Sequence, residues 1–349
     1  MKIEKRVLFI LKKREDYGSK LYPYVQGLST GLLNSAGFMN DMLTPLKITS
    51  DMVVVNDDND IDREVTKYKP THVIIESLWV VPKKFDELSK LHPNVIWIIR
   101  IHSNSPFLAG EGIAIKWISS YLDEPNVIIA ANSSRMQDEI ITAIGKAHTN
   151  VKDRVILLPN FYPQEYEKVK SIDYSKEYID ISCFGAIRPL KNHLTQAIAA
   201  IRFADDINKK LRFHINSGRI EMSNDSVFKN LVSLFECNSR HELIDHAWVQ
   251  RDEFIKTCRK MDIGMQVSFS ETFNIVAADH ISQGVPIVVS EEVPWATSIY
   301  TTEPTNSEYI CLSIKKAYYF NYFNVLFNQW GLRAYTNKTK KIWCKHFGG

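Results

Sequence analysis

The chain has 349 residues, of which 45% are hydrophobic and 24% are charged, and its formal net charge is +3. This composition is typical of a soluble globular protein and excludes an intrinsically disordered chain, while the length is sufficient for two domains. The small net charge excludes a polycation that binds nucleic acid or membranes through bulk charge, although it does not exclude a local patch.

The cysteines and the apolar runs indicate the compartment. The five cysteines are widely spaced and include no C-x₂-C pair, which argues against a disulfide framework and a zinc cluster. The apolar run at residues 7–11 is too short for a signal peptide, and no stretch approaches the roughly 20 apolar residues of a membrane span. A soluble, unprocessed protein with reduced thiols in the cytoplasm is therefore predicted.

Short apolar runs alternate with helical periodicity through the first half of the chain. Strands are predicted at residues 7–11, 52–55, 71–75, 95–101, 127–131 and 155–158, and helices at residues 32–43, 83–91 and 134–144. Strands that alternate with helices predict a parallel, doubly wound sheet. An unusually long polar loop follows the first strand, and loops of this length inside a compact domain are often functional.

The same alternation continues in the second half. Strands are predicted at residues 179–184, 212–216, 243–245, 261–267 and 286–289, and helices at residues 192–201, 227–235 and 273–283. The segment 160–176 carries a proline, several charges and no clear period, so it is the predicted linker. The predicted domains are residues 1–165 and 177–320, followed by aromatic-rich closing helices at residues 321–349.

Residues 271–290 (ETFNIVAADHISQGVPIVVS) combine spaced acids, helical periodicity and a Gly-x-Pro stop before a β-branched run. Glu271 is predicted at a loop-to-helix junction and Asp279 a little over two turns later, so both carboxylates can project toward one ligand. The N–H groups and the dipole at the start of this helix favour phosphate. Two acids for hydroxyls beside a phosphate site suggest a nucleotide sugar, whereas the alternative is an ordinary amphipathic helix.

This stretch resembles the signature of retaining GT-B glycosyltransferases of the glycogen-synthase-like and mannosyltransferase-like group, E-x₇-E followed by a small residue and G-x-P-V-V. Here Asp279 replaces the second Glu, and Asn274 stands where the family usually has Gly. The resemblance implies an α/β GT-B fold, in which two Rossmann-like domains with doubly wound parallel sheets face a central cleft. It implies that the donor is bound by Glu271, Thr272, Phe273, Asn274 and Asp279.

A second motif, CFGAIRPLKN, places Gly185, Arg188 and Lys191 just after a predicted strand. Two cations three residues apart beside a glycine turn suit a diphosphate. The family is similar in carrying G-x-x-R followed by a nearby Lys, and this resemblance implies that Arg188 and Lys191 bind the donor diphosphate. A solvated basic turn is the alternative.

Two further candidates lie in the N-terminal half. His102 follows the fourth predicted strand, where a side chain faces the cleft, and the resemblance implies that it contacts the transferred sugar. The sequence GLSTG, which ends at Gly31, resembles the family's loop near the donor phosphate, although a helix cap explains it equally well. Asn160 in LPNFYP is a weaker candidate, because Phe161 replaces the family's glycine.

The acids of DDND offer a different interpretation. Asp58 and Asp60 form a D-x-D that could hold a metal-bound nucleotide sugar in the other glycosyltransferase fold. A turn that precedes a helix beginning near Ile61 is the preferred interpretation, and histidines at metal-ligand spacing are not found. The resemblance implies a GT-B enzyme without a bound metal, so no metal and no cofactor beyond the donor substrate is predicted.

The predicted function is transfer of a sugar, with retention, from a nucleoside-diphosphate donor, with UDP the expected nucleotide. The predicted catalytic residues are His102, Arg188, Lys191 and Glu271. A hydroxymethylated pyrimidine in DNA is the predicted acceptor, because the long loop interleaves cations with tyrosines and the N-terminal half is similar to bacteriophage glycosyltransferases. Polysaccharide, lipid or protein acceptors, a nucleotide-sugar epimerase, and a non-catalytic sugar- or nucleic-acid-binding protein are the alternatives.

Overall fold

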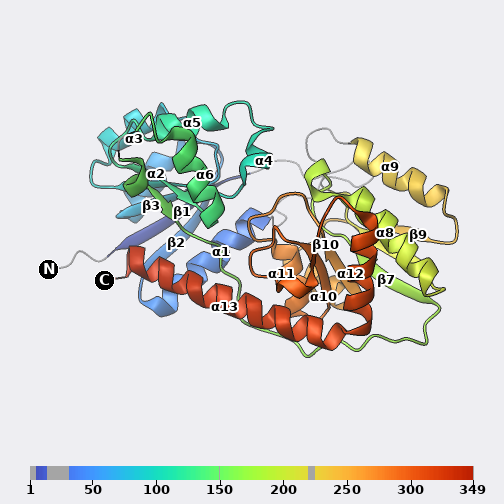
Figure 1. Ribbon diagram of the computed structural model, residues 1–349. Helices are drawn as coiled ribbons and strands as arrows, with labels where there is room; N and C mark the ends of the chain where they lie inside the picture. Colours follow the sequence, from blue (N-terminus) through green and yellow to red (C-terminus); the bar gives the residue numbers. More distant parts are fainter. Residues whose placement is uncertain (1–4, 14–30, 149, 219–224, 349) are drawn as a thin grey trace. The chain divides into compact units, whose positions relative to one another are not determined.

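The computed structural model describes residues 5–13, 31–148, 150–218 and 225–348, which form two compact α/β units (Figure 1). The described residues of the first unit lie before Arg14, between Thr30 and Pro163, and from Thr336 onward. The second unit runs from Gln164 to Tyr335. In the described parts of both units, no helix is both long and apolar enough to cross a bilayer.

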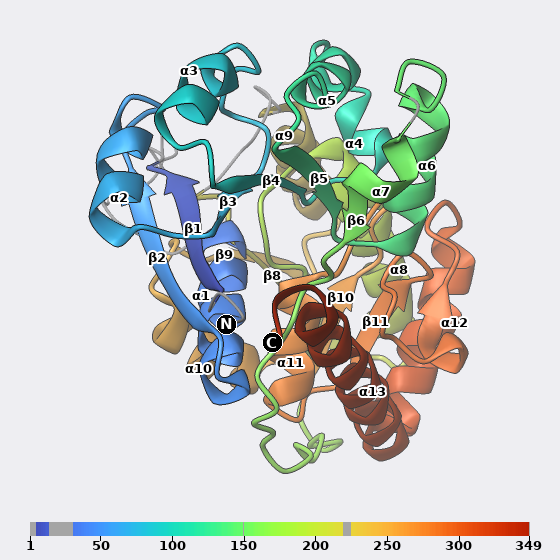
Figure 2. The same ribbon diagram turned by 90° about the vertical axis from the view of Figure 1, so that its left-hand side faces the viewer.

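The first unit is built on a six-stranded parallel sheet with the strand order β2-β1-β3-β4-β5-β6 (Figure 2). The strands are β1 (Arg6–Lys12), β2 (Thr49–Val55), β3 (His72–Glu76), β4 (Ile96–Ile101), β5 (Val127–Ala131) and β6 (Val155–Leu157). Successive side chains of β1 alternate between two apolar layers: Leu8 and Ile10 pack into one, and Val7 and Phe9 into the other. Burial of both faces explains why the strand reads as a continuous apolar run.

Helices cover both faces of this sheet. They are α1 (Gly31–Leu43), α2 (Asp60–Tyr68), α3 (Lys84–Leu91), α4 (Ser105–Leu108), α5 (Ala114–Tyr121), α6 (Ser134–Ile144) and α7 (Val151–Arg154), with a 3-10 turn η1 (Thr44–Leu46). The layer that contains Val7 and Phe9 also holds Trp343 and Phe347, from the last turns of α13 (Asn321–Phe347). The end of the long C-terminal helix is therefore part of the core of the first unit.

The second unit has its own six-stranded parallel sheet, with the order β12-β11-β10-β7-β8-β9. Its strands are β7 (Tyr178–Ser182), β8 (Lys210–Ile215), β9 (Glu242–Asp245), β10 (Ile263–Gln266), β11 (Ile287–Ser290) and β12 (Thr301–Thr302). The chain winds outward from β7 through β8 and β9, and then returns to the other side of β7 with β10. The carboxyl ends of β7 and β10 therefore flank the topological switch point, where ligands bind in doubly wound sheets.

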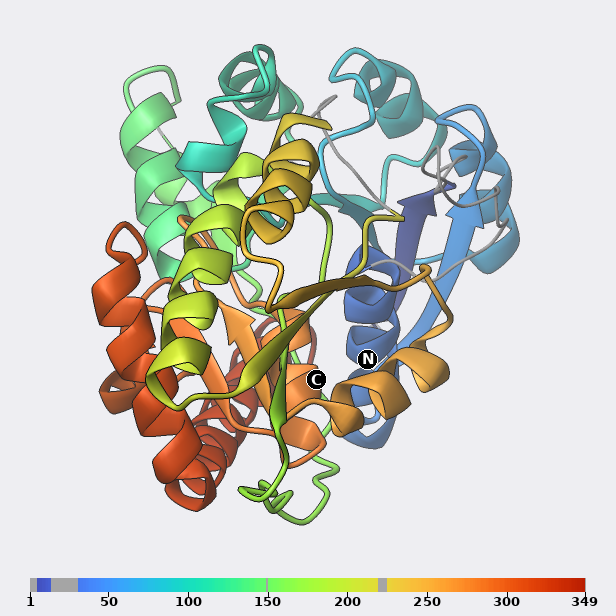
Figure 3. The ribbon, with the colours of Figure 1, turned by 90° about the vertical axis from the view of Figure 1, so that its right-hand side faces the viewer.

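The helices of the second unit are α8 (His193–Asp206), α9 (Asp225–Glu236), α10 (Arg251–Lys260), α11 (Ile275–Ser282) and α12 (Ser307–Tyr319), with 3-10 turns η2 (Pro189–Lys191) and η3 (Ser298–Tyr300). Helices α8 and α12 pack side by side (Figure 3). Gly284, which ends the α11 segment, has a φ of 69°, and a Cβ there would lie 2.2 Å from the carbonyl oxygen of Lys168. Glycine is therefore required at this position by both its backbone conformation and the space.

The predicted fold class of two doubly wound parallel sheets is confirmed, and the strands and helices occur in the predicted order. The periodicity missed the helices α4, α5, α7 and α10 and the two-residue strand β12, and it placed the start of α11 two residues too early. α10 escaped detection because its exposed face is strongly charged, with only Cys258 fully buried. The strand predicted at residues 261–267 is shorter, because only Ile263–Gln266 pair with a neighbour.

Candidate functional site

The switch point of the second sheet brings together the loops that follow β7 and β10. The first loop carries Gly185, Arg188 and Lys191, and the second carries Glu271 to Asn274. These are the two motifs that the sequence singled out, although 80 residues separate Lys191 from Glu271 in the chain. The topology thus places both at the edge of the sheet where a ligand is expected.

Gly185 makes the turn out of β7 in a conformation that favours glycine. Its φ is 114°, and its N–H donates to Asn216 Oδ1 at 2.7 Å. The nearest atom to a Cβ built here would be Cγ2 of Val276, at 4.0 Å, so the backbone conformation, and not crowding, selects glycine. Asn216 is itself buried just after β8, so the neighbouring strand holds this turn in place.

Lys191 and Glu271 form an ion pair that joins the two loops. The ammonium of Lys191 contacts Glu271 Oε1, and the side chains are only 13% and 9% exposed. Gln196 fixes the backbone on either side of this pair, because its amide donates to the Lys191 carbonyl at 2.8 Å and its Oε1 accepts from the Val267 N–H at 2.8 Å. Arg188 lies three residues earlier, half-buried in extended backbone. The site therefore holds a cation and a carboxylate side by side.

The loop from Glu271 to Asn274 ends in a helix cap. Asn274 has a φ of 64°, and its side-chain oxygen accepts from the N–H of Ala277 at 2.9 Å. Its amide group donates to Gln266 Oε1 at 3.0 Å, while the Phe273 carbonyl accepts from the indole of Trp295 at 2.7 Å. The expectation that the helix begins at Phe273 is wrong, because the left-handed Asn274 separates Phe273 from the first helical residue, Ile275. Thr272 is buried in the same loop.

Asp279 has a partner that the sequence did not reveal. Its carboxylate receives two hydrogen bonds from Arg251, at 2.6 and 3.3 Å, and the Asp279 side chain is 2% exposed. Arg251 opens α10, the helix that the periodicity missed. The two acids of the signature thus pair with different cations, Glu271 with Lys191 and Asp279 with Arg251. A bidentate Arg–carboxylate pair fixes the direction of Asp279 more firmly than a single contact would.

In the first unit, His102 belongs to a buried charged network. His102 Nε2 contacts Glu76 Oε2, and Arg100 Nη1 donates to Glu76 Oε1 at 3.1 Å. Arg100 also donates to Asn160 Oδ1 at 2.5 Å and to the Leu158 carbonyl at 3.1 Å. Glu76 and Arg100 have no exposed side-chain surface, whereas His102 is 15% exposed. Asn160 therefore has a structural partner in Arg100.

The charges of this network follow from burial and pairing. Burial would raise the pKa of Glu76, but the charges of Arg100 and His102 outweigh it and hold that pKa below its usual range. Burial lowers the pKa of His102, although Glu76 opposes that shift. A charged Glu76 can only accept a hydrogen bond, so the contact requires a proton on Nε2 of His102, whether the imidazole is neutral or charged. The network thus fixes the orientation of His102 and keeps a proton on its Nε2.

The remaining candidates lie apart from these networks or outside the described residues. Gly31 is the exposed first residue of α1, and residues 27–30 of the same motif lie outside the described part of the chain. Asp60 begins α2 as predicted, and its carboxylate accepts from the Asn56 N–H at 3.0 Å and from Arg63 at 2.8 Å. Lys12 ends β1 and Lys13 follows it, but Arg14, Lys20 and the tyrosines of the long loop lie outside the described residues.

His193, the first residue of α8, makes the stability of the fold depend on pH. It is 1% exposed, and among the described residues neither ring nitrogen has a hydrogen-bond partner. Burial, and then the charges of Lys191 and Arg188, lower the pKa of His193 to about 3 from its ordinary 6.5. The unfolded chain therefore binds a proton before the folded chain does. The contribution of His193 to stability is complete above about pH 6.5 and decreases as the pH falls toward 3.

We expect the variant His193→Leu to lose less stability in acid than the natural chain. The free energy of unfolding, measured by urea denaturation at pH 8 and pH 5, should fall by about 2 kcal/mol less in the variant over that interval. At pH 8 the imidazole is neutral in both states, so the difference between the two proteins there reports packing alone. Parallel loss of stability in both proteins would contradict a neutral, buried His193.

Comparisons with known proteins bear on the fold. No protein-family model matches the sequence, and no curated protein matches it. A solved E. coli trehalose-6-phosphate structure bound with UDP-2-fluoro glucose is similar, with a TM-score of 0.70, 9% identity and 99% of each chain covered. The structure of sucrose-phosphate synthase from Thermosynechococcus elongatus is similar with a TM-score of 0.68 and 11% identity, and 98% of each chain is covered.

HepE from Anabaena, solved in complex with UDP-glucose, gives a TM-score of 0.64 at 12% identity and covers 97% of this chain and 96% of its own. At such low identities the likeness shows the fold alone. Together with the two parallel six-stranded sheets, it confirms the predicted GT-B class. The chain has the GT-B fold along nearly its whole length.

Proposed function

We propose that the protein is a glycosyltransferase that moves a sugar from a nucleoside-diphosphate donor, with UDP as the nucleotide, to an acceptor hydroxyl. The observation that carries this proposal is the cluster of Gly185, Arg188, Lys191 and Glu271 at the switch point of the second sheet. Two of the similar solved structures, from E. coli and Anabaena, hold a UDP-sugar. Cations, a carboxylate and a helix N-terminus are the groups that such a donor needs.

In this proposal the donor's diphosphate binds Arg188, Lys191 and the backbone N–H groups near Gly185 and at the start of α11. Lys191 is already close to Glu271, so the ammonium is held in place before the donor arrives. The sugar hydroxyls would be bound by Glu271 and by backbone groups of Thr272, Phe273 and Asn274. Asp279, oriented by Arg251, would accept hydrogen bonds from the ribose. His102 would contact the transferred sugar, as the family resemblance implies.

The proposed reaction proceeds with retention and without a protein nucleophile. The bond between the anomeric carbon and the diphosphate oxygen breaks, and the acceptor oxygen bonds to that carbon on the same face. The proton of the acceptor hydroxyl passes to the leaving phosphate oxygen, so the products are the glycoside and the free nucleoside diphosphate. Arg188 and Lys191 stabilise the charge that develops on the leaving group, which is usually the largest catalytic contribution.

For the acceptor we propose a hydroxymethylated pyrimidine in DNA. The support lies in the sequence from the end of β1 onward, where Lys12, Lys13, Arg14 and Lys20 are interleaved with tyrosines. Cations interleaved with aromatic rings suit a phosphate backbone and an exposed base. Polysaccharide, lipid or protein acceptors fit the same donor chemistry. The donor assignment does not depend on the choice among them.

Incubation with radiolabelled UDP-sugars tests the proposal. A transferase releases UDP and labels an acceptor, an epimerase converts the free donor, and a binding protein does neither. We expect transfer to continue in excess chelator, because Arg188, Lys191 and a helix N-terminus already neutralise the diphosphate. Label on hydroxymethylated DNA, with salt-sensitive binding, would support the DNA acceptor. If no UDP-sugar binds and none is turned over, the glycosyltransferase assignment fails.

A further inference from the structure

The N-terminal half of α13 exposes a stripe of large apolar side chains. Nineteen large apolar side chains are exposed in the described part of the chain. Five of them form this aromatic stripe: Tyr322, Phe323, Leu326, Phe327 and Trp330, which are 40% to 69% exposed. Two more, Tyr319 and Phe320, directly precede α13. Single exposed apolar residues need no explanation, but such a cluster marks an interaction surface.

Buried polar side chains on the opposite face of α13 hold the stripe in its exposed position. Asn324 is fully buried and binds both backbone groups of Ile287, accepting from its N–H at 2.9 Å and donating to its carbonyl at 2.8 Å. Asn328 Oδ1 accepts from the Thr297 N–H at 2.9 Å, and Gln329 donates to the Ile281 carbonyl at 3.2 Å. Rotation of the helix would break these buried hydrogen bonds, so the aromatic side chains cannot turn inward.

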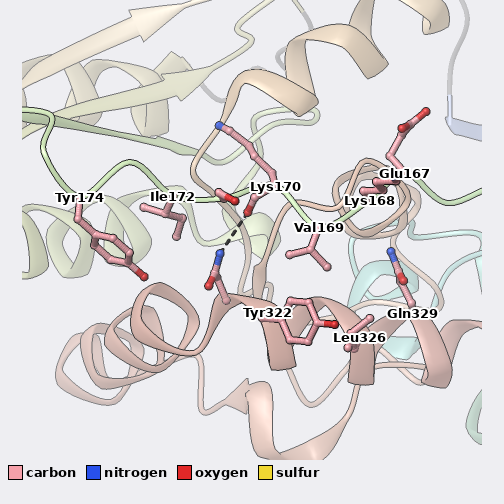
Figure 4. A pocket seen from close by; sticks show the side chains of 11 residues that line it. Glu167, Lys168, Val169, Lys170, Ile172, Tyr174, Tyr322, Leu326 and Gln329 are labelled. Atoms are coloured by element: carbon pink, nitrogen blue, oxygen red, sulfur yellow. Dashed lines mark hydrogen bonds between the residues drawn. The ribbon is translucent and has the colours of Figure 1, made fainter.

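A recess adjoins the aromatic stripe. A cavity of about 590 Å³ is lined on one side by Tyr322 and Leu326 of α13 and on another by Val169 and Ile172 of the preceding segment (Figure 4). Asn321 closes one end by donating to the Lys170 carbonyl at 3.1 Å. The volume is in the range of small-ligand sites. The surface therefore combines protruding aromatic rings with a recess of mixed lining, which also includes Glu167, Lys168 and Lys170.

The charge along the helix that carries the stripe has one sign. From Tyr309 to the last residue the chain contains seven lysines and arginines and no aspartate or glutamate. Among these cations, Lys316 precedes the stripe and is exposed, and Arg333, Lys338, Lys341 and Lys345 are exposed farther along α13. No charged residue lies within the stripe, from Tyr319 to Trp330. The aromatic block is thus flanked by cations on a helix that lacks acids.

We infer that the aromatic stripe is a docking surface for a lipid bilayer that contains anionic lipids. Phe, Leu and Trp side chains would enter the interface between headgroups and acyl chains, where amphipathic helices bury such residues. The flanking lysines would lie beside the lipid phosphates, each contributing an attraction that salt weakens. The helix would lie on the membrane without crossing it, in agreement with the absence of any spanning helix among the described residues.

The same observations argue against two other partners. A second copy that docked through this surface around a two-fold axis would bring the lysines and arginines of the two α13 helices together, and among the residues that line the adjoining recess only Glu167 is acidic. Single-stranded nucleic acid is bound by aromatic rings that lie along a positively charged groove, whereas here five apolar side chains form one uncharged block on a helix. A bilayer interface matches both the apolar block and its cationic flanks.

Vesicle sedimentation tests the inference on the full chain. We expect binding to vesicles of equimolar phosphatidylcholine and phosphatidylglycerol, and binding at least about tenfold weaker to phosphatidylcholine alone. The triple variant Phe323→Ser, Phe327→Ser, Trp330→Ser should lose at least about tenfold in vesicle affinity. A matched control is Leu91→Ser, Ile115→Ser, Ile299→Ser, which removes three apolar side chains of 52%, 52% and 60% exposure elsewhere and should bind like the natural chain.

Trp330 gives a direct optical readout. Of the seven tryptophans, all among the described residues, only Trp330 is exposed, at 69%. Its emission should shift to shorter wavelength on anionic vesicles, and Trp330→Phe should abolish the shift while vesicle binding persists. Equal sedimentation of the triple variant and the natural chain would overturn the inference. So would absence of vesicle binding together with stripe-dependent dimers or stripe-dependent binding of single-stranded DNA. None of these outcomes depends on whether the protein transfers sugar.

Discussion

Lys191→Ala is expected to lower the turnover of sugar transfer by about a hundredfold to a thousandfold while the fold remains intact. Lys191 lies at the switch point of the second sheet, and its side chain is 13% exposed, so a diphosphate can reach the ammonium from solvent. Its charge would matter most as the leaving group departs. The effect should therefore appear in kcat more than in KM, as measured by release of UDP at saturating donor.

Lys229→Ala is a suitable control, because it removes an exposed lysine from α9 in the same unit. Arg188→Ala should reduce turnover in the same direction, and the double variant should lose less than the product of the two single effects, since both cations act on one diphosphate. Circular dichroism and urea denaturation must show folded proteins. Full activity in both single variants would show that Arg188 and Lys191 do not form the donor site.

Arg100→Met is expected to destabilise the first unit by about 3 to 5 kcal/mol, because it leaves the charge of Glu76 buried without its main partner. Neither Arg100 nor Glu76 has exposed side-chain surface, and the variant also deprives Asn160 and the Leu158 carbonyl of a donor. The free energy of unfolding from urea denaturation measures this loss. The expected effect is among the largest for any single substitution outside the apolar core.

The double variant Glu76→Leu, Arg100→Met separates charge burial from lost packing. Replacing a buried ion pair by apolar side chains of similar volume is often close to neutral, so the double variant should recover a substantial part of the lost stability. Arg63→Met is a matched control, because Arg63 pairs with Asp60 at the surface, where its own side chain is 65% exposed, and its loss should change the stability little. If Arg100→Met were as stable as the natural chain, Arg100 would not be needed to stabilise the buried charge of Glu76.

Much of the fold could be predicted because it depends on local patterns. β1 and β5 are continuous apolar runs, as strands buried on both faces must be, and Gly284 marks the end of α11 through its positive φ. The loops after β7 and β10 could be singled out since glycine, cations and acids there are grouped within a few residues.

The partners of the site residues could not be predicted, because they depend on contacts between distant parts of the chain. Arg251 is 28 residues from Asp279, and Glu76 is 26 residues from His102. A lone arginine at the start of a charged helix resembles a surface residue in sequence. Glu76 and Arg100 are the exceptions that a signal could have revealed, since each charge lies in an otherwise apolar run, which suggests that it is buried and paired.

Helix α13 contributes residues to both units, and this affects when the first unit can complete its folding during synthesis. Trp343 and Phe347 belong to the same apolar layer as Val7 and Phe9, and the Trp343 indole donates to the Pro159 carbonyl at 3.0 Å. A ribosome synthesises those aromatic residues only after the entire second unit. Domains usually fold as they emerge, N-terminal first, but here the earlier unit must wait for the last turns of the chain to complete its core. Until then α1, through Met39 and Leu43, would cover part of that apolar layer, and the rest would be accessible to chaperones.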